Sequence, residues 1–259
     1  MATATKKKPK HKKIETQPGM GAIPKSGQGT TFRVWAPNAE KVSVVGEFNA
    51  WKKEDHIMHA EGDGYWTLDI PKVKEGMEYK FAVHSKNRSE LRNDPFTRQM
   101  TNSDGNSIVA KRKFSFKESD FKIADLDKLM IYQMHIGTFN REEKKDKVGS
   151  FKSAQKILGY LKNLGINAVQ LMPVAEFAGG ISWGYNPAAP FAIESDYGGP
   201  NAFAEFVDKA HGHGIAVIID VVYNHFGPSD TDLWQFDGWS ENDKGGIYFY
   251  NGRGRQRIC

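Results

Sequence analysis

The sequence predicts an antiparallel β-sandwich of the immunoglobulin-like class, followed by an incomplete α/β barrel of the TIM type with three of eight strands. Two observations predict this order. Short runs of alternating polar and apolar residues, separated by turn residues, occupy residues 29–116, which is typical of antiparallel sheets. In residues 117–251, longer apolar runs alternate with stretches of helical periodicity, which is typical of parallel strands joined by helices.

The composition is that of an ordinary globular protein with a basic N-terminal tail. The 259 residues carry a formal net charge of +5 and are 39% hydrophobic, which is enough to form one or two domains. Residues 1–13 hold six lysines and no acid, and the rest holds 30 basic and 31 acidic residues. We interpret residues 1–28 as a disordered basic tail and linker. Attraction of the tail to a polyanion is an alternative, but the remaining sequence has no basic stripe that indicates a specific nucleic-acid partner.

The sequence predicts a cytoplasmic location and no membrane association. No apolar run approaches the roughly 20 residues that a membrane helix needs. The N-terminus lacks the apolar segment of a secretory signal. The single cysteine, Cys259, leaves no partner for an internal disulfide, as is usual for proteins of reducing compartments.

Four runs in residues 29–116 have the period of a β-strand. They are Thr31–Trp35, Lys41–Val45, Gly64–Ile70 and Glu78–Val83. Turn-forming pairs such as Pro37-Asn38 and Asp94-Pro95 separate the runs, which favours a sandwich of short strands. The segment Pro18–Gly29 is rich in glycine and proline and is predicted to be a linker.

Residues Phe32–Asn38 and Val42–Trp51 resemble the carbohydrate-binding sandwich that precedes the barrel in glycogen branching enzymes and isoamylases. In members that bind glucan, the resemblance implies sugar contacts at Trp51, Lys80 and Asn106. An indole suits the apolar face of a pyranose, and lysine and amide groups suit its hydroxyls. Glycogen-binding versions often carry a second aromatic residue near Leu91, which this chain lacks. The alternative is that Trp51 packs in the core and the module only braces the barrel.

Three apolar runs after residue 129 are predicted to be parallel strands, namely Met130–Ile136, Ile166–Met172 and Ile215–Ile219. Between these runs lie two segments whose apolar residues recur at the spacing of one helix face, and we call each such set a helical stripe. The first stripe consists of Ile157, Leu158, Leu161 and Leu164, and the second of Phe203, Phe206, Val207 and Ala210. Pro200 precedes the second stripe, where the first turn of a helix tolerates proline.

The third run ends on polar residues. Five consecutive apolar residues, Ile215–Ile219, predict a strand that is covered on both faces. Asp220 follows directly, and Asn224 and His225 come shortly afterwards. In α/β barrels the C-terminal ends of the strands carry the chemistry. From these residues alone, a structural Asp–His pair and a functional site are both open interpretations.

Three separated segments, Tyr132–Thr138, Leu164–Tyr185 and Asp220–His225, resemble the start of the barrel in the α-amylase superfamily of glycoside hydrolases and transferases. The resemblance implies three substrate-binding residues. Tyr185 would stack under a sugar ring, His225 would hydrogen-bond a hydroxyl of that sugar, and Asp220 would hold the floor of the site. These contacts suit an oxocarbenium-like transition state with a flattened ring. The alternative for Tyr185 is a packed loop aromatic.

The sequence predicts no metal and no cofactor. Asn224 aligns with a calcium ligand of many amylases, but a single oxygen ligand is far short of the six to eight that Ca²⁺ takes.

No acid in this chain matches the catalytic carboxylates of the superfamily, which follow the fourth and fifth strands, so none of its residues is expected to be catalytic. Residues 129–259 number 131, about half of the roughly 250 in a complete barrel. We interpret Glu176, Glu194 and Asp196 as solvated residues or as residues at the start of the next helix. The chain alone is therefore expected to be inactive. Residues 252–259 are interpreted as an aberrant tail that resembles neither strand nor helix, as a truncated or frame-shifted reading frame would produce.

Three functions remain open at this stage, and the predicted partner in each is an α-glucan such as glycogen, starch or maltooligosaccharide. The resemblance is strongest to 1,4-α-glucan (glycogen) branching enzymes. Asp220–Pro228 is more similar to hydrolases such as maltooligosyl trehalose trehalohydrolase and isoamylase. A non-catalytic glucan-binding protein is the third possibility. The sequence does not indicate an oligomeric state.

Overall fold

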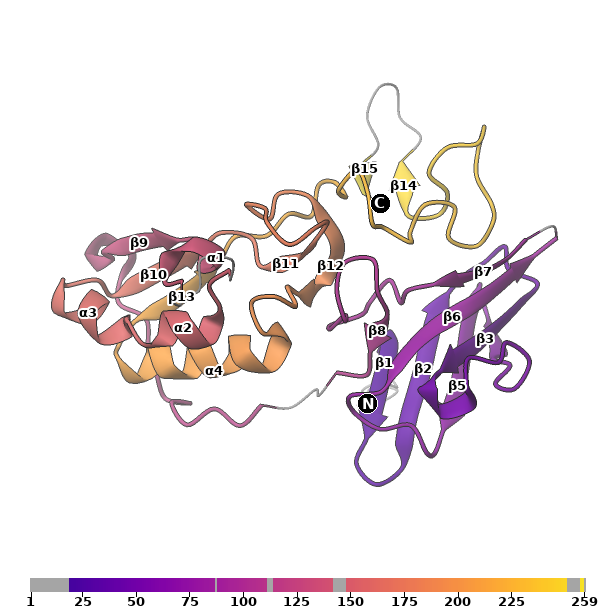
Figure 1. The fold of residues 1–259 in the computed structure, drawn as a ribbon, viewed down its shortest axis with the longest axis horizontal. Helices are drawn as coiled ribbons and strands as arrows, with labels where there is room; N and C mark the ends of the chain where they lie inside the picture. The colour runs from indigo at the N-terminus through magenta and orange to yellow at the C-terminus, as the bar shows by residue number, and fades with distance from the viewer. Residues whose placement is uncertain (1–18, 87, 111–113, 142–147, 251–256, 259) are drawn as a thin grey trace, which may run out of the picture.

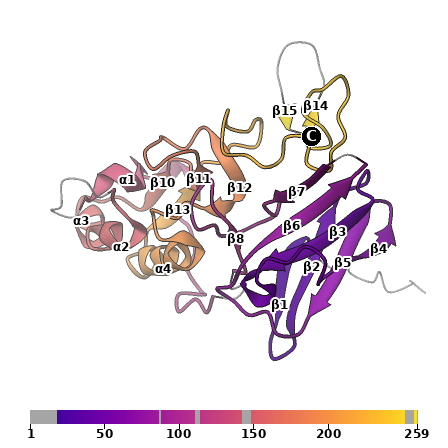
Figure 2. The same cartoon turned by 45° about the vertical axis from the view of Figure 1, so that its right-hand side comes forward.

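The computed structural model describes residues 19–250, apart from 87, 111–113 and 142–147, together with 257–258. These residues form a β-sandwich and an α/β part that lie side by side (Figures 1 and 2). Of the predicted tail and linker, residues 1–28, the first 18 residues lie outside the described residues.

The sandwich consists of two antiparallel sheets. The first has the strand order β1-β2-β5-β4, formed by Gly21–Lys25, Gly29–Trp35, Tyr65–Ile70 and His59–Gly62. The second has the order β3-β6-β7, with β8 also paired to β6, formed by Lys41–Gly46, Glu78–Ser85, Arg88–Arg92 and Ser107–Ile108. A short 3₁₀ turn, η1 (Glu47–Asn49), follows β3. All four predicted strand runs are confirmed.

The inner faces of the two sheets meet in one aromatic core. Phe32 on β2 and Tyr79 on β6 are buried, and their ring centroids lie 4.9 Å apart in an edge-to-face arrangement. Phe81 packs edge-on against both rings. Alternate residues of each strand therefore face the core, as the period of two in the sequence predicts.

The prediction of a linker over Pro18–Gly29 is wrong from Gly21 onward, because Gly21–Lys25 forms β1 and pairs antiparallel with β2. A tight turn at Gly27 closes this hairpin with a φ of 71°, a conformation that suits glycine. Pro24 lies within β1 and is tolerated because β1 is an edge strand. The glycines and proline that suggested a linker instead mark a hairpin.

The α/β part is built on a three-stranded parallel sheet with the order β13-β10-β9. These strands are Ala216–Ile219, Ala168–Leu171 and Ile131–Met134. The helical elements are η2 (Leu126–Lys128), α1 (Ile136–Phe139), α2 (Phe151–Gln155), α3 (Leu158–Asn163) and α4 (Gly199–Gly212). A two-stranded antiparallel sheet of β11 (Ala175–Phe177) and β12 (Pro187–Ile193) lies in the segment between β10 and α4. Helices α2, α3 and α4 lie on one side of the parallel sheet (Figure 1).

The helical stripes are confirmed in part, since Ile157 and Val207 are only half-buried. Phe206 and Ala210 on α4, and Leu158 and Leu161 on α3, are fully or almost fully buried in the core of the α/β part. Leu164 is 57% exposed, so its placement on the buried stripe is wrong. It is the C-cap residue of α3, at the end of the helix that the buried positions Leu158 and Leu161 belong to.

The expectation that the third strand is covered on both faces is also wrong. Ile219 on β13 is 42% exposed, and Val217 and Ile218 are only half-buried. In the described part of the chain β13 is an edge strand that pairs with β10 alone, and α4 packs against it. The apolar run is therefore buried at its start, at Ile215 and Ala216, and becomes exposed toward its end at Ile219.

The segment that follows β13 returns to the sandwich and completes its core. Leu233, Phe236 and Phe249 are each at most 7% exposed and belong to the same apolar cluster as Phe32 and Phe81. Figure 1 shows this yellow segment beside β7. The segment after β13 therefore belongs to the core of the sandwich, whereas the parallel sheet and its helices have a core of their own.

Polar contacts fix the same segment to the sandwich. Asp237 is fully buried and accepts hydrogen bonds of 2.9 Å from both the backbone N and Nδ2 of Asn38. Arg92 on β7 donates from Nη2 to the Gln235 carbonyl at 3.2 Å. The two hydrogen bonds from Asn38 satisfy the Asp237 carboxylate, which would otherwise be costly to bury.

The interpretation of residues 252–259 as neither strand nor helix is wrong for Arg257–Ile258, which form β15 and pair antiparallel with β14 (Phe249–Tyr250). Residues 252–256 and 259 lie outside the described residues.

Candidate glucan-binding site

The structure brings together Tyr185, Asp220 and His225, the three residues singled out in the α/β part. The Tyr185 hydroxyl donates to Asp220 Oδ2 at 2.8 Å. His225 Nε2 lies 2.8 Å from the Tyr185 carbonyl oxygen, which can only accept, so Nε2 is the donor. We call these three residues the Tyr185 cluster. Tyr185 remains 42% exposed, so its ring is accessible to a ligand.

The end of β13 places two members of the cluster. The strand stops at Ile219, and the Asp220 backbone N still donates to the Leu171 carbonyl on β10 at 3.0 Å. Asp220 is thus fixed at the C-terminal edge of the parallel sheet. His225 follows within the next five residues of the chain, beyond the strand end where α/β folds bind ligands.

A glycine positions the third member. Gly184 precedes Tyr185 with a φ of 87°, and a Cβ built on it would lie 2.3 Å from the Pro173 carbonyl oxygen. The loop therefore passes too close to the backbone after β10 for any other residue. This close approach sets the Tyr185 side chain over the end of the sheet, within reach of Asp220.

The hydrogen bond with Asp220 raises the pKa of the Tyr185 phenol above its usual value, because the donated proton stabilises the neutral form beside a carboxylate. The phenol therefore stays neutral and presents an uncharged aromatic face. Such a face can pack against the apolar side of a sugar ring, and the imidazole of His225 and the carboxylate of Asp220 lie beside it as polar groups.

His135 is a residue of this region that the sequence reasoning did not single out. It directly follows β9, and its Nε2 lies 2.8 Å from the Ser182 carbonyl oxygen and 3.1 Å from the Tyr197 hydroxyl. It occupies the same position relative to β9 as Asp220 does relative to β13. This shared position after a strand was the signal that could have found it.

The interpretation of Glu176 and Glu194 as solvated is wrong, because each is 1% exposed. Glu176 accepts from the Ser195 backbone N at 2.8 Å and from Ser195 Oγ at 3.2 Å. Glu194 accepts from the backbone N of Phe177 at 3.3 Å and of Asp196 at 3.1 Å. Each carboxyl therefore bonds backbone beside the other glutamate, which ties β11 to the segment after β12. Asp196 itself is exposed.

Burial makes the carboxyl groups of both glutamates weaker acids than usual. It raises the pKa of Glu176 to about 8, with the charge of Glu194 as the second cause. It likewise raises the pKa of Glu194 to about 7. A low-polarity surrounding disfavours the ionised form, and two neighbouring carboxyls disfavour simultaneous ionisation. The hydrogen bonds that each accepts from backbone N–H groups lower its pKa and offset part of the effect.

The three residues predicted to contact sugar in the sandwich lie apart from the Tyr185 cluster. Trp51 is half-buried, and its backbone N donates to the Gly46 carbonyl at 3.0 Å. The Lys80 side chain is 16% exposed, with Nζ 3.9 Å from Asp232 in the segment after β13. Asn106 donates from Nδ2 to Glu78 Oε2 at 2.7 Å. Lys80 and Asn106 thus have protein partners, and a sugar role for the three residues stays a prediction.

Trp51 gives a direct test of that prediction. We expect the Trp51→Ala variant to be retained less than the parent chain on immobilised glycogen, because the indole is the largest apolar surface among the three residues. The measurement is elution volume from a glycogen column against an agarose blank. A matched Trp239→Ala variant removes another indole of the chain, 43% exposed. Equal retention of Trp51→Ala and the parent would leave the sandwich with a bracing role only.

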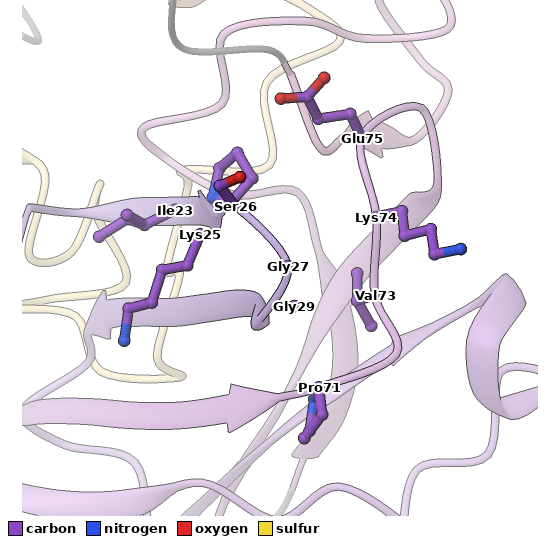
Figure 3. Close-up of a pocket in the computed structure, with 10 residues that line it drawn as sticks. Ile23, Lys25, Ser26, Gly27, Gly29, Pro71, Val73, Lys74 and Glu75 are labelled. Carbon is purple, nitrogen blue, oxygen red and sulfur yellow. The ribbon is translucent and has the colours of Figure 1, made fainter.

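A separate cavity of about 690 Å³ lies at the β1–β2 hairpin and the loop after β5. Figure 3 shows Lys25, Lys74 and Glu75 around it. The residues that line it come from the sandwich, and none of them is aromatic.

Within the described ranges, no group of three or more His, Cys, Asp or Glu side chains could hold a metal ion. Among the helices of these residues, none has the length and apolar character of a membrane span.

The sandwich and the parallel α/β part each correspond to a known protein family. Residues 19–97 match carbohydrate-binding module 48, the isoamylase N-terminal domain, and residues 96–252 match the alpha amylase catalytic domain. The chain belongs to the alpha-amylase family.

Curated relatives agree with this assignment. The chain is 36% identical over 221 residues to the 1,4-alpha-glucan branching enzyme of Nitrosomonas europaea, covering 81% of this chain and 30% of the relative. It is 39% identical over 221 residues to that of Picrophilus torridus, covering 83% of this chain and 30% of the relative. The chain thus spans about 30% of the length of these relatives.

Solved structures show the same fold. A Salmonella typhimurium structure assigned to the alpha amylases superposes with a TM-score of 0.77 at 32% identity, covering 92% of this chain and 38% of that one. The catalytic module of a glycogen-degrading pneumococcal virulence factor superposes with a TM-score of 0.68 at 22% identity, covering 85% of this chain and 39% of that one. The second likeness concerns the fold alone.

Proposed function

We propose that this chain supplies the start of an α-glucan-active enzyme, most similar to 1,4-α-glucan branching enzymes, and that the Tyr185 cluster binds one glucose unit of its substrate. The observation that carries the proposal is the geometry of the cluster. Tyr185 offers an exposed ring, and Asp220 holds its hydroxyl at 2.8 Å. Sequence similarity to branching enzymes extends over about four fifths of the chain and supports the same substrate class.

We further propose that β9, β10 and β13 are the first three strands of an eight-stranded barrel. Their parallel order and the location of Asp220 after β13 support this. In such barrels the loops at the C-terminal ends of the strands form the active site. The Tyr185 cluster would then line one wall of a cleft that further strands complete.

We propose that the 259-residue chain by itself does not turn over starch. A retaining glycosidase or transferase uses two carboxylates about 5–5.5 Å apart, as nucleophile and as acid/base. The Tyr185 cluster contains one carboxylate, Asp220, and its Oδ2 already accepts the Tyr185 hydroxyl. The three residues of the cluster suit the binding and orientation of a sugar, and they do not include the second carboxylate that breaking its glycosidic bond requires.

Binding to Tyr185 can be tested on the chain itself. We expect Tyr185→Ala to weaken binding of maltoheptaose by about two- to tenfold, since an aromatic contact is worth about 0.5–1.5 kcal/mol and about 1.4 kcal/mol corresponds to tenfold. Tyr185→Phe keeps the ring and removes the hydroxyl that donates to Asp220, so it should retain most of the affinity. The measurement is an NMR titration of each variant. Unchanged affinity in Tyr185→Ala would contradict the proposed site.

Hydrolysis is the second candidate function. The run Asp220–Pro228 resembles hydrolases more than branching enzymes, and the Salmonella typhimurium structure assigned to the alpha amylases is 32% identical. Product analysis on the protein that joins this chain to a complete catalytic barrel separates the two. New α-1,6 branch points without a rise in reducing ends support branching, whereas a rise in reducing ends supports hydrolysis.

A further inference from the structure

Two histidines hold the loop that presents Tyr185, and they come from different strand ends. His225, after β13, donates Nε2–H to the Tyr185 carbonyl at 2.8 Å. His135, after β9, has Nε2 at 2.8 Å from the Ser182 carbonyl oxygen. The two carbonyls lie three residues apart in the same loop. The loop is therefore clamped at its start and at Tyr185 itself.

The hydrogen-bond partners of His135 define which nitrogen donates. A carbonyl oxygen only accepts, so Nε2 must carry a proton to bond Ser182. Nδ1 lies 3.0 Å from the Thr138 hydroxyl, whose one proton is directed either to Nδ1 or to the His135 carbonyl oxygen at 3.5 Å. The hydroxyl of Tyr197, a residue that is 2% exposed, lies 3.1 Å from Nε2 and gives the imidazole a further contact. Both ring nitrogens of His135 therefore have hydrogen-bond partners within the protein.

The bond to Ser182 is transmitted to Tyr185 through a short chain of contacts. Ser182 Oγ accepts from the Gly184 backbone N at 3.0 Å and donates to Asn186 Oδ1. A Cβ built on Gly184 would lie 2.3 Å from the Pro173 carbonyl oxygen, so the loop runs close to the backbone after β10 at this residue. Fixing the Ser182 carbonyl thus fixes the path of the residues on both sides of Tyr185.

We propose that His135 is a positioning residue of the glucan site: its Nε2–H bond to the Ser182 carbonyl holds the Tyr185 ring in the orientation that receives a glucose unit of an α-glucan. This inference rests on the function proposed above. His135 does not touch the sugar. It lowers the conformational entropy that the loop would otherwise lose when the sugar binds.

Three variants test the proposal on the full chain. The amide of Gln reaches about as far as Nε2 of histidine and can donate to Ser182, whereas the amide of Asn reaches only as far as Nδ1. His135→Gln should therefore keep the loop fixed, and His135→Asn and His135→Ala should release it. Hydrogen exchange of the Gly184 amide, followed by mass spectrometry of the peptide that contains it, measures this directly. We expect exchange about tenfold faster in the Asn and Ala variants and near the parent rate in the Gln variant.

Maltoheptaose titrations complete the test. We expect a loss of affinity in His135→Asn and His135→Ala and its rescue in His135→Gln, at similar melting temperatures for the Asn and Gln variants. Equal exchange and equal affinity in these two variants would overturn the proposal. The Tyr185→Ala variant separates the two ideas. If it binds as the parent does, the proposed site fails, whereas faster exchange at Gly184 in His135→Asn still shows that His135 holds the loop.

Discussion

Replacing Phe236 with alanine will destabilise the sandwich, although this residue follows β13 in the other part of the chain. Phe236 is 1% exposed and lies in the same apolar cluster as Phe32, with its ring 5.4 Å from that of Tyr248. Truncating a buried phenylalanine costs about 3–5 kcal/mol. We expect a lower melting temperature and faster hydrogen exchange in β2 and β6, measured by circular dichroism and mass spectrometry.

The control for this prediction is Phe116→Ala, which removes the same side chain at a position that is 46% exposed. It should change the melting temperature little. If Phe236→Ala accelerates exchange only in the segment after β13 and leaves β2 and β6 as in the parent, the shared core does not contribute to the stability of the sandwich.

Replacing Glu176 with glutamine will stabilise the chain at alkaline pH and leave its stability nearly unchanged at acidic pH. The pKa of Glu176 is raised from its usual 4.5 to about 8. Between these values the folded state holds a proton that the unfolded chain has lost, so the free energy of unfolding falls as pH rises through this window. Below pH 4.5 both states are protonated, and above pH 8 the folded state carries the full cost of a buried charge.

Glutamine removes this cost because it cannot ionise, and its amide still offers an acceptor for the Ser195 backbone N and a donor for Ser195 Oγ. One pKa unit corresponds to about 1.4 kcal/mol, so we expect the Gln variant to be more stable by a few kcal/mol at pH 9 and nearly equal at pH 4. Urea denaturation at both pH values measures the difference. Glu205→Gln, at an exposed position of α4, is the control. A stability gain of the same size at pH 4 and pH 9 would contradict a raised pKa as its cause.

The sequence predicted the elements whose burial follows a simple period. Phe32 and Val34 alternate into the core, Phe206 and Ala210 lie on one helical face, and both patterns are confirmed. The predicted site residues Tyr185, Asp220 and His225 are also brought together. Their convergence follows from the topology, because the C-terminal ends of parallel strands meet at one edge of a sheet.

The sequence did not predict contacts between segments far apart in the chain. Glu176 and Glu194 are acids, and composition places acids at the surface, yet each finds backbone N–H donors across the β11–β12 hairpin. β7 was missed because its charged sequence, Arg88–Arg92, has no apolar period and it lies at the edge of its sheet. The ion pair of Lys80 with Asp232 depends on the path after β13, which no local pattern reports.

The core shared between the sandwich and the segment after β13 has a consequence for synthesis on the ribosome. Strands β1 to β8 leave the exit tunnel early, but Leu233, Phe236 and Phe249 belong to the same cluster and are translated more than a hundred residues after β8. Domains usually fold in order as they emerge. In this protein the core of the sandwich stays incomplete, and accessible to chaperones, until Leu233, Phe236 and Phe249 have been synthesised and can pack into it.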